Sequence, residues 1–375
     1  MVERSTPADA APLSGTELLL LGRRDRADAR GRLRRLSAEE QARACSELRA
    51  ELRSEFLMLC DCPEEVVPLL PEAEFAHTIR AGGLSEAGWL LEIASDLQIT
   101  ACFDLDCWDG EEFRIERVGE WVDALIEAGR PTLTRVLRST DLELWLLALW
   151  NETQVTIVGK EDDPPDGTFT PDGVVYFGVP DGVSPHRVHE ITQGAFEADQ
   201  PLYWRLVYGL LFEVPAEVEE YALRWRTNRL SDLGFPDREQ AMRVYRSLSP
   251  TRAEETAEVE LSGDIVRGFD LPKQLRGSLL GEALSELSPE VASDVLGYVL
   301  GVANSIAVAD CLQLSDPESV PKALEKTVEG IDTGLREVAR VRGRPPHEIL
   351  ESTAPLELFR AGATLKPELR GPYRG

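Results

Sequence analysis

The chain has 375 residues, of which 43% are hydrophobic, and its formal net charge is -27. This length and composition predict a globular protein of two or three packed modules with a sizeable core. The negative charge argues against nucleic acid or an anionic membrane as a partner for most of the surface, because like charges repel.

Residues 1–36 are expected to form a leader that ends in an arginine-rich arm. The first residues lack a signal-peptide pattern, because acidic residues precede the short apolar run "LLLL". The arm, residues 22–35, has seven arginines against two aspartates. One helical stripe of the arm carries Arg23, Arg26, Arg30 and Arg34. Such a stripe can bind nucleic acid or lipid headgroups. Docking on the protein's own acidic surface or on a partner is favoured, because the arm has no aromatic residue for base stacking.

Residues 37–151 are predicted to be an irregular helical-repeat, solenoid-like domain. Ser37 and Glu40 form a capping box that starts a helix ending near Leu59. The chain then divides into short apolar-periodic segments separated by Pro, Gly, Ser or Asp. Short helices cannot bury their apolar faces alone, so we expect them to stack on one another.

The stretch "DLDCWDG" in this domain begins like a calcium-binding loop. Asp104 and Asp106 match the first and third ligand positions, but Trp108 stands at the fifth and no Glu follows at the twelfth. A turn between two helices, with acidic N-caps and with Phe103 and Trp108 packed inside, is therefore favoured.

Residues 152–183 are predicted to form a β-hairpin. Two runs rich in β-branched and aromatic residues, "TQVTIVG" and "GVVYFGV", flank a long acidic loop. A central helical module follows over residues 184–248, with Ser184 and Pro185 at the start of its first helix.

His186 and His189 lie three residues apart in this module, with Glu190 beside them. Two histidines at this spacing can share a metal ion. The sequence offers no third ligand and no HExxH pattern, so we expect neither a metal site nor a cofactor.

Residues 249–271 are predicted to be a linker, residues 272–360 a C-terminal helical module, and residues 361–375 a loose tail. Small residues recur every four positions in one helix of this module, which permits close approach of a partner helix. These residues are Ser293, Gly297, Gly301, Ser305 and Ala309. The weakly charged stretch around them, residues 295–309, is too short to cross a bilayer. Without CxxC pairs, the six cysteines are expected to be reduced thiols of a cytoplasmic protein.

The most charged helix, "EEYALRWRTNRLSDLGFP" over residues 219–236, yields the candidate site. A helical wheel places Arg229 in the centre of an apolar arc beside Trp225. The candidate residues on this side are Glu219, Trp225, Arg226, Arg229 and Asp232. Glu220 and Arg224 lie opposite and form a solvent-exposed pair.

Burying an unpaired arginine is too costly, so Arg229 needs Asp232, Glu219 or a carboxylate from another helix. A buried lock between arginine and carboxylate is the favoured interpretation. The alternative is a pocket in which Arg226 and Arg229 bind a small anion such as a carboxylate or phosphate.

Four stretches resemble an uncharacterised bacterial family, domain of unknown function 6178. They are "DLDCWD", "EEYALRWRTNRLSDLGFPDREQAMRVY", "VANSIAVAD" and "LELFRAGA". The resemblance implies no activity, substrate or cofactor. The N-terminal helices also resemble, more loosely, the superhelical domains of MgtE-type transporters and flagellar-motor switch proteins, which implies protein contact or regulation.

These observations predict a mainly α-helical protein with a small β-hairpin. The sequence has no glycine-rich phosphate loop and no GxSxG motif, which removes the usual reasons to propose an enzyme. We expect a non-enzymatic scaffold that presents helical surfaces to a protein partner. The alternatives are an anion binder or unrecognised enzyme using Arg226 and Arg229, and an adaptor for nucleic acid or membrane surfaces using residues 22–35.

Overall fold

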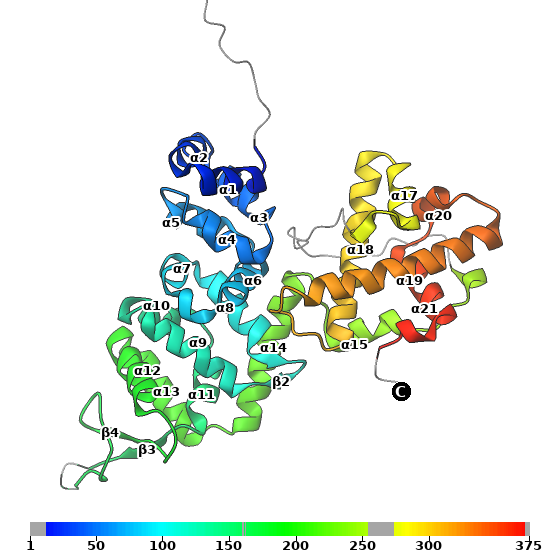
Figure 1. Ribbon diagram of the computed structural model, residues 1–375. Helices are drawn as coiled ribbons and strands as arrows, with labels where there is room; N and C mark the ends of the chain where they lie inside the picture. The colour runs from blue at the N-terminus through cyan, green and yellow to red at the C-terminus, as the bar shows by residue number, and fades with distance from the viewer. Residues whose placement is uncertain (1–12, 160, 162, 254–273, 372–375) are drawn as a thin grey trace, which may run out of the picture.

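The structure, a computed structural model, describes residues 13–159, 161, 163–253 and 274–371. It is mainly helical, as predicted, and consists of an N-terminal and a C-terminal lobe connected through helix α14 (Figure 1). Most of the predicted linker, the start of the leader and the end of the tail lie outside the described residues.

The N-terminal lobe contains helices, two small hairpins and two one-turn 3-10 helices. Its first helices are α1 (Gly15–Arg24), α2 (Arg26–Leu33), α3 (Ala38–Ser46), α4 (Ala50–Leu57), α5 (Pro63–Val66), η1 (Val67–Leu69), α6 (Glu72–Gly82), η2 (Leu84–Glu86), α7 (Gly88–Ile93) and α8 (Asp96–Asp106). Its later elements are β1 (Trp108–Asp109), β2 (Glu112–Phe113), α9 (Ile115–Glu127), α10 (Arg130–Ser139), α11 (Leu142–Trp150), β3 (Gln154–Ile157), β4 (Val175–Gly178), α12 (Pro185–Ala198) and α13 (Gln200–Phe212).

Helix α14 (Pro215–Asp232) leads from this lobe into the second. The C-terminal lobe consists of α15 (Arg238–Met242), η3 (Arg243–Tyr245), η4 (Pro250–Arg252), α17 (Leu279–Ser285), α18 (Pro289–Ala309), α19 (Ser319–Arg342), α20 (Pro346–Ser352), α21 (Pro355–Leu365) and η5 (Pro367–Leu369).

The capping box at Ser37 forms as predicted, but the helix after it is shorter than expected. The Ser37 hydroxyl accepts from the Glu40 backbone amide, and the Glu40 carboxylate accepts from the Ser37 amide. The chain breaks between α3 and α4, where buried Arg53 donates to the carbonyls of Ser46 and Leu48. These bonds satisfy carbonyls that the interrupted helix leaves free. Helices in this lobe range from four residues in α5 to fourteen in α12, so a regular solenoid is not confirmed.

The stretch "DLDCWDG" forms the end of α8 and a tight hairpin, so the predicted turn with acidic N-caps was wrong. Strands β1 and β2 pair with Trp108 opposite Phe113. Gly110, with a φ of 62°, supplies the left-handed residue that a two-residue hairpin turn requires. The expected burial of Phe103 and Trp108 is confirmed.

The second hairpin, β3 and β4, lies where the two runs of β-branched and aromatic residues predicted it. Val155 pairs with Phe177 and Ile157 with Val175 in antiparallel register. Val175 and Phe177 point into the core, whereas Thr156 and Tyr176 on the other face are exposed and half-buried, as expected of a strand pair with one solvated face.

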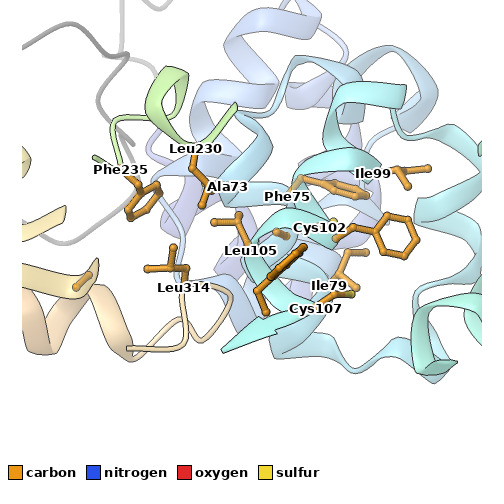
Figure 2. Close-up of a cluster of buried hydrophobic side chains, with 14 of the residues drawn as sticks. Ala73, Phe75, Ile79, Ile99, Cys102, Leu105, Cys107, Leu230, Phe235 and Leu314 are labelled. Atoms are coloured by element: carbon orange, nitrogen blue, oxygen red, sulfur yellow. The ribbon is translucent and has the colours of Figure 1, made fainter. Parts of the chain in front are cut away.

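The two lobes meet where residues 310–316, here named the junction segment, contact α6 and α8. The buried His77 ring lies 2.9 Å from the Leu314 carbonyl through its Nε2 atom. Figure 2 shows the apolar part of this contact, in which Leu314 lies near Leu105 of α8, with Leu230 and Phe235 beside it. One continuous cluster of buried apolar side chains therefore runs through both lobes.

Helix α18 is longer than the weakly charged stretch that marked it in the sequence. It has 21 residues, and among the described residues it alone is long and apolar enough to cross a membrane by length and composition. About 44% of its most apolar window is buried inside the protein, against α19 and α15 among others. Core helices of soluble proteins have the same length and composition, so this feature is weak evidence for a membrane span.

The predicted ridge of small residues on α18 is not where the closest helix crossing occurs. Gly301 and Ser305 of that ridge remain half-buried. Helices α19 and α21 approach much more closely, because a Cβ atom on Gly334 would lie 1.8 Å from the Leu358 carbonyl oxygen. A Cβ atom on Gly362 would lie 1.9 Å from the Gly330 carbonyl oxygen, so this crossing needs glycine on both helices.

The C-terminal tail begins later than the sequence indicated. Helix α21 continues to Leu365, and Ala361 and Ala363 are buried within it. Leu369 of η5 is also buried, so the chain up to this point belongs to the packed lobe.

Candidate functional site

The C-terminal half of α14 carries a partly buried ion-pair cluster centred on Arg229. Its Nε and Nη2 atoms bind the two carboxylate oxygens of Asp104 at 2.6 and 2.9 Å. Its Nη1 atom lies 2.7 Å from a carboxylate oxygen of Asp141. Asp141 occupies the N-cap of α11 without making a capping hydrogen bond. All three nitrogens of Arg229 are therefore engaged by the protein's own carboxylates.

Arg226 adds a second cation to this cluster, and it is almost fully enclosed. Its Nε donates to the Asp104 carbonyl at 2.7 Å and its Nη1 to the Gly110 carbonyl at 3.1 Å. The guanidinium lies over the Trp108 ring, 5.2 Å from its centroid. Burial lowers the pKa of Arg226 to about 10. Two arginines and two aspartates balance, so the cluster, here named the hub, is neutral.

Burial also shifts the pKa of a carboxylate in the hub, that of Asp104. Desolvation raises the pKa of Asp104, and the ion pair with Arg229 opposes that effect. The geometry matches the predicted lock, with a partner from another helix. The anion pocket loses its main donor, because a ligand would have to displace Asp104 or Asp141 from Arg229.

Three of the predicted site residues lie outside the hub. Asp232 is exposed and Glu219 is half-buried, and neither forms an ion pair with Arg226 or Arg229. Trp225 is 48% exposed, although the wheel placed it in the apolar arc. The buried face of α14 instead follows every fourth residue, so it turns slowly around the helix, and both α11 and α8 pack on α14. The buried residues are Val218, Ala222, Arg226 and Leu230.

Asp106, two residues after Asp104, organises the contact with the C-terminal lobe. Its carboxylate accepts from the Trp121 indole at 2.7 Å and from the Ser315 hydroxyl at 2.5 Å. Arg80 forms a further ion pair with it at 3.2 Å. Asp104 and Asp106 of "DLDCWD" thus hold two different segments, α14 and the junction segment.

The N-terminal half of α14 forms one wall of a groove lined with aromatic side chains. Helix α13 forms the other wall, and both helices pack on α11, which forms the floor. The groove has a volume of about 660 Å³. Its lining consists of Leu142, Glu143, Leu146, Arg205, Tyr208, Gly209, Phe212, Glu213, Val218, Tyr221 and Trp225. Gly209 sits directly on Leu146, since a Cβ atom there would lie 2.5 Å from a Leu146 methyl carbon.

Large apolar side chains gather at this groove and are exposed to solvent. Phe212 is 72% exposed and Tyr208 53%, while Tyr221 and Trp225 are each about half exposed. Val214, between the two helices, is 50% exposed as well. Contiguous exposed apolar surface of this kind is rare on monomeric proteins and marks interaction sites.

Of the residues that line the groove, only Trp225 was among the site residues predicted from the sequence. The signal was present in "YWRLVYGLLF", where Trp204, Tyr208 and Phe212 recur every four residues. An aromatic stripe at this spacing is usually a core face, so sequence alone favours burial. In the folded protein, Tyr208 and Phe212 instead line the groove and stay exposed to solvent.

The four arginines of the arm's helical stripe, Arg23, Arg26, Arg30 and Arg34, contact other parts of the same lobe. Arg23 binds Glu55 of α4 through two hydrogen bonds, and Arg34 pairs with Asp61. Arg26 and Arg30 both donate to one backbone carbonyl, that of Met58 at the C-terminal end of α4. Cations are favoured at a helix C-terminus, because the last carbonyls lack partners. These contacts support docking of the arm on its own lobe.

The two histidines of α12 do not assemble a metal site. His186 and His189 are exposed, and the His189 ring contacts Glu190 and Phe169. Within the part of the chain that the structure describes, no group of three metal-ligating side chains is found.

The chain matches a family of unknown function, DUF6178, over residues 30–374. The protein belongs to this family. No curated protein and no solved structure matches the chain. The looser resemblance to MgtE-type and flagellar switch domains therefore stays a prediction.

The four stretches that carry the family resemblance meet in space. Asp104 of the first binds Arg229 of the second. Asn304 of the third donates to the Gly234 carbonyl just after α14, at 3.0 Å. Phe359 of the fourth contacts the ring of Tyr245, which ends the second stretch. The stretches therefore meet at α14 and within the C-terminal lobe.

Proposed function

We propose that the protein is a non-enzymatic scaffold that binds a protein partner in the aromatic groove between α13 and α14. The observation that carries the proposal is the exposure of Tyr208, Phe212, Tyr221 and Trp225 around one concave surface. Tyrosine and tryptophan dominate the energetics of protein interfaces, because they bury large areas at a small entropic cost.

The floor of the groove is rigid, which favours binding with little rearrangement. Leu146 is buried under Gly209, and Val218 is buried on the opposite wall. The aromatic side chains are thus presented on packed helices rather than on loops. A surface held in this way loses less conformational entropy when a partner binds.

The hub supports the proposal because it gives the charged residues a structural role. Arg229 is saturated by Asp104 and Asp141. A function that needs Arg229 to bind an outside anion would have to break these contacts first. The groove needs no such change, since its side chains already face solvent.

The proposal is tested by affinity purification of the full chain from its native cells, followed by mass spectrometry. The double variant Phe212→Ser, Trp225→Ser should lose a specific partner that the wild type retains, without a change in unfolding midpoint. Leu97→Ser is the matched control, because Leu97 is 66% exposed but lies on α8, outside the groove lining. Retention of the same partners by the double variant would contradict the proposal.

A further inference from the structure

We propose that a cavity between the two lobes binds a short aliphatic carboxylate, whose charge is held by Arg226 and Arg238. The cavity has a volume of about 50 Å³. It shares no lining residue with the aromatic groove, so this inference stands apart from the function proposed above. Three features of the cavity support this ligand: a nearly buried hydrogen-bond donor without an acceptor, a second cation, and walls that are mostly apolar.

The cavity lies where α14, the first hairpin and the junction segment meet. The hairpin of β1 and β2 contributes Trp108 and Gly110, and α14 contributes Arg226. The C-terminal lobe contributes Arg238 of α15 and Cys311 of the junction segment. A ligand in this cavity would therefore contact both lobes at once.

Arg226 supplies the observation that points to an anion. Its Nε and Nη1 atoms donate to backbone carbonyls, but its Nη2 group has no hydrogen-bond acceptor among the described residues. The side chain is only 6% exposed, and the Nη2 group still reaches solvent. Burial lowers the pKa of Arg226 only to about 10, so the guanidinium stays charged at neutral pH. A negatively charged oxygen is the acceptor that such a donor binds most strongly.

Arg238 places a second guanidinium at the same cavity. Its Nη1 donates to the Cys311 Sγ at 2.7 Å, which holds the side chain toward the junction segment. Two guanidiniums at one cavity can share the two oxygens of a carboxylate. The cavity is also lined by Glu111, which is exposed, and by Asp237, whose carboxylate caps α15 by accepting from the Gln240 amide at 2.8 Å.

The charge and the walls of the cavity select the class of anion. Two arginines against two carboxylates leave the lining without net charge, which favours a monoanion over a doubly charged phosphate. The remaining walls are mostly apolar and include Val308, Leu230 and Leu314, of which the last two are labelled in Figure 2. Apolar walls with a few convergent polar groups are typical of sites for small organic ligands.

The size of the cavity sets the length of the ligand. One water molecule needs roughly 10–15 Å³ of such space, so the cavity holds about three to five atoms of this size. Acetate and propionate have this size. Propionate is the better probe, because its longer aliphatic part contacts more of the apolar walls.

The proposal is tested by the reaction of Cys311 with iodoacetamide, a neutral thiol reagent, in the full chain. Cys311 lines the cavity and is half-buried, whereas Cys62 is exposed and lies outside the cavity. Sodium propionate at ten times its dissociation constant should slow alkylation of Cys311 by about tenfold, as mass action requires, and leave Cys62 unchanged. Mass spectrometry of the digested protein measures both rates.

Other salts separate a specific site from a general salt effect. Sodium chloride at the same ionic strength should protect neither cysteine, and sodium phosphate should protect Cys311 less than propionate does. Equal protection of Cys311 by the three salts, or stronger protection by phosphate, would overturn the inference. No protection by propionate would overturn it as well.

Matched variants assign the binding to the charges of the cavity, through the propionate concentration that halves the Cys311 rate. Arg238→Gln should raise this concentration about tenfold or more, because a hydrogen bond to a charged group is lost. Arg224→Gln, at an exposed position of α14 outside the cavity, should not change it. An unchanged concentration in Arg238→Gln would overturn the inference.

A gain-of-binding variant tests the same charges without removing a packed side chain. Glu111 is exposed, so Glu111→Gln removes a repelling carboxylate from the rim of the cavity. Propionate should then bind about twofold to fivefold more tightly, since the two charges no longer repel each other. Unchanged or weaker binding in Glu111→Gln would contradict the proposed position of the carboxylate.

Discussion

Helix α14 carries two kinds of functional side chain, arginines near its end and aromatic rings nearer its start. The arginines have partners inside the protein, whereas the rings face solvent. The C-terminal half carries Arg226 and Arg229, whose charges are balanced inside the protein by Asp104 and Asp141. Nearer its start, α14 presents the rings of Tyr221 and Trp225, each about half exposed to solvent. The more conspicuous charges are thus structural, and the side chains that lack a partner are the aromatic ones.

The largest expected effect separates these halves by removing Arg229. Arg229→Met leaves Asp104 buried without its cation, which should lower the free energy of unfolding by about 3–5 kcal/mol. Arg224→Met, the same change in the exposed pair with Glu220, should lower it by less than about 0.5 kcal/mol. Urea unfolding of both variants measures the difference. Similar stability of the two, with loss of phosphate binding in Arg229→Met, would instead restore the anion pocket.

A second effect concerns His77, at the contact between the lobes, which should make the free energy of unfolding depend on pH. Burial lowers the pKa of His77 to about 4 from its ordinary value near 6.5. The unfolded chain therefore binds a proton below about pH 6.5, while the folded protein resists protonation until about pH 4. Stability is fully present above pH 6.5 and decreases by about 3 kcal/mol as the pH falls to 4.

Urea unfolding between pH 7.5 and pH 4.5 measures this loss. In His77→Gln the neutral amide can still donate to the Leu314 carbonyl, so this part of the pH dependence should disappear. The acidic groups of the chain titrate in both proteins and cancel in the comparison. An unchanged pH dependence in the variant would show that His77 does not carry it.

A smaller effect is expected at the other buried contact of the junction segment. Ser315→Ala removes one hydrogen bond to the Asp106 carboxylate but leaves those from Trp121 and Arg80. The free energy of unfolding should fall by about 1–2 kcal/mol, as for a bond to a charged group. Ser231→Ala, at an exposed position of α14, is the control and should change little. Equal losses in Ser315→Ala and Ser231→Ala would show that the Ser315 hydroxyl does not stabilise the contact between the lobes.

The smallest expected effect on stability is at the groove. Phe212→Ser and Trp225→Ser remove half-exposed or more exposed rings, so each should change the free energy of unfolding by less than about 1 kcal/mol. Their effect on partner binding should be large. A loss of several kcal/mol would mean that the rings belong to the core, and the contrast between the two halves of α14 would fail.

Local signals in the sequence were sufficient for much of the fold. Ser184 and Pro185 placed the start of α12 correctly, and Gly234, with its positive φ, follows the end of α14. The hairpin of residues 152–183 followed from its β-branched runs. The tight hairpin at Gly110 was missed, although Asp109 and Gly110 carried a turn signal.

The sequence by itself determined that Arg229 must be paired, because an isolated charge cannot be buried, and that Glu220 and Arg224 would face solvent. Only the tertiary structure decided which carboxylates meet Arg229, since Asp104 and Asp141 are distant in the chain and reach it through α8 and α11. It also decided that Trp225 faces outward. A helical wheel assumes one buried face along the whole helix, whereas the buried residues of α14 recur every fourth position and so turn around the helix.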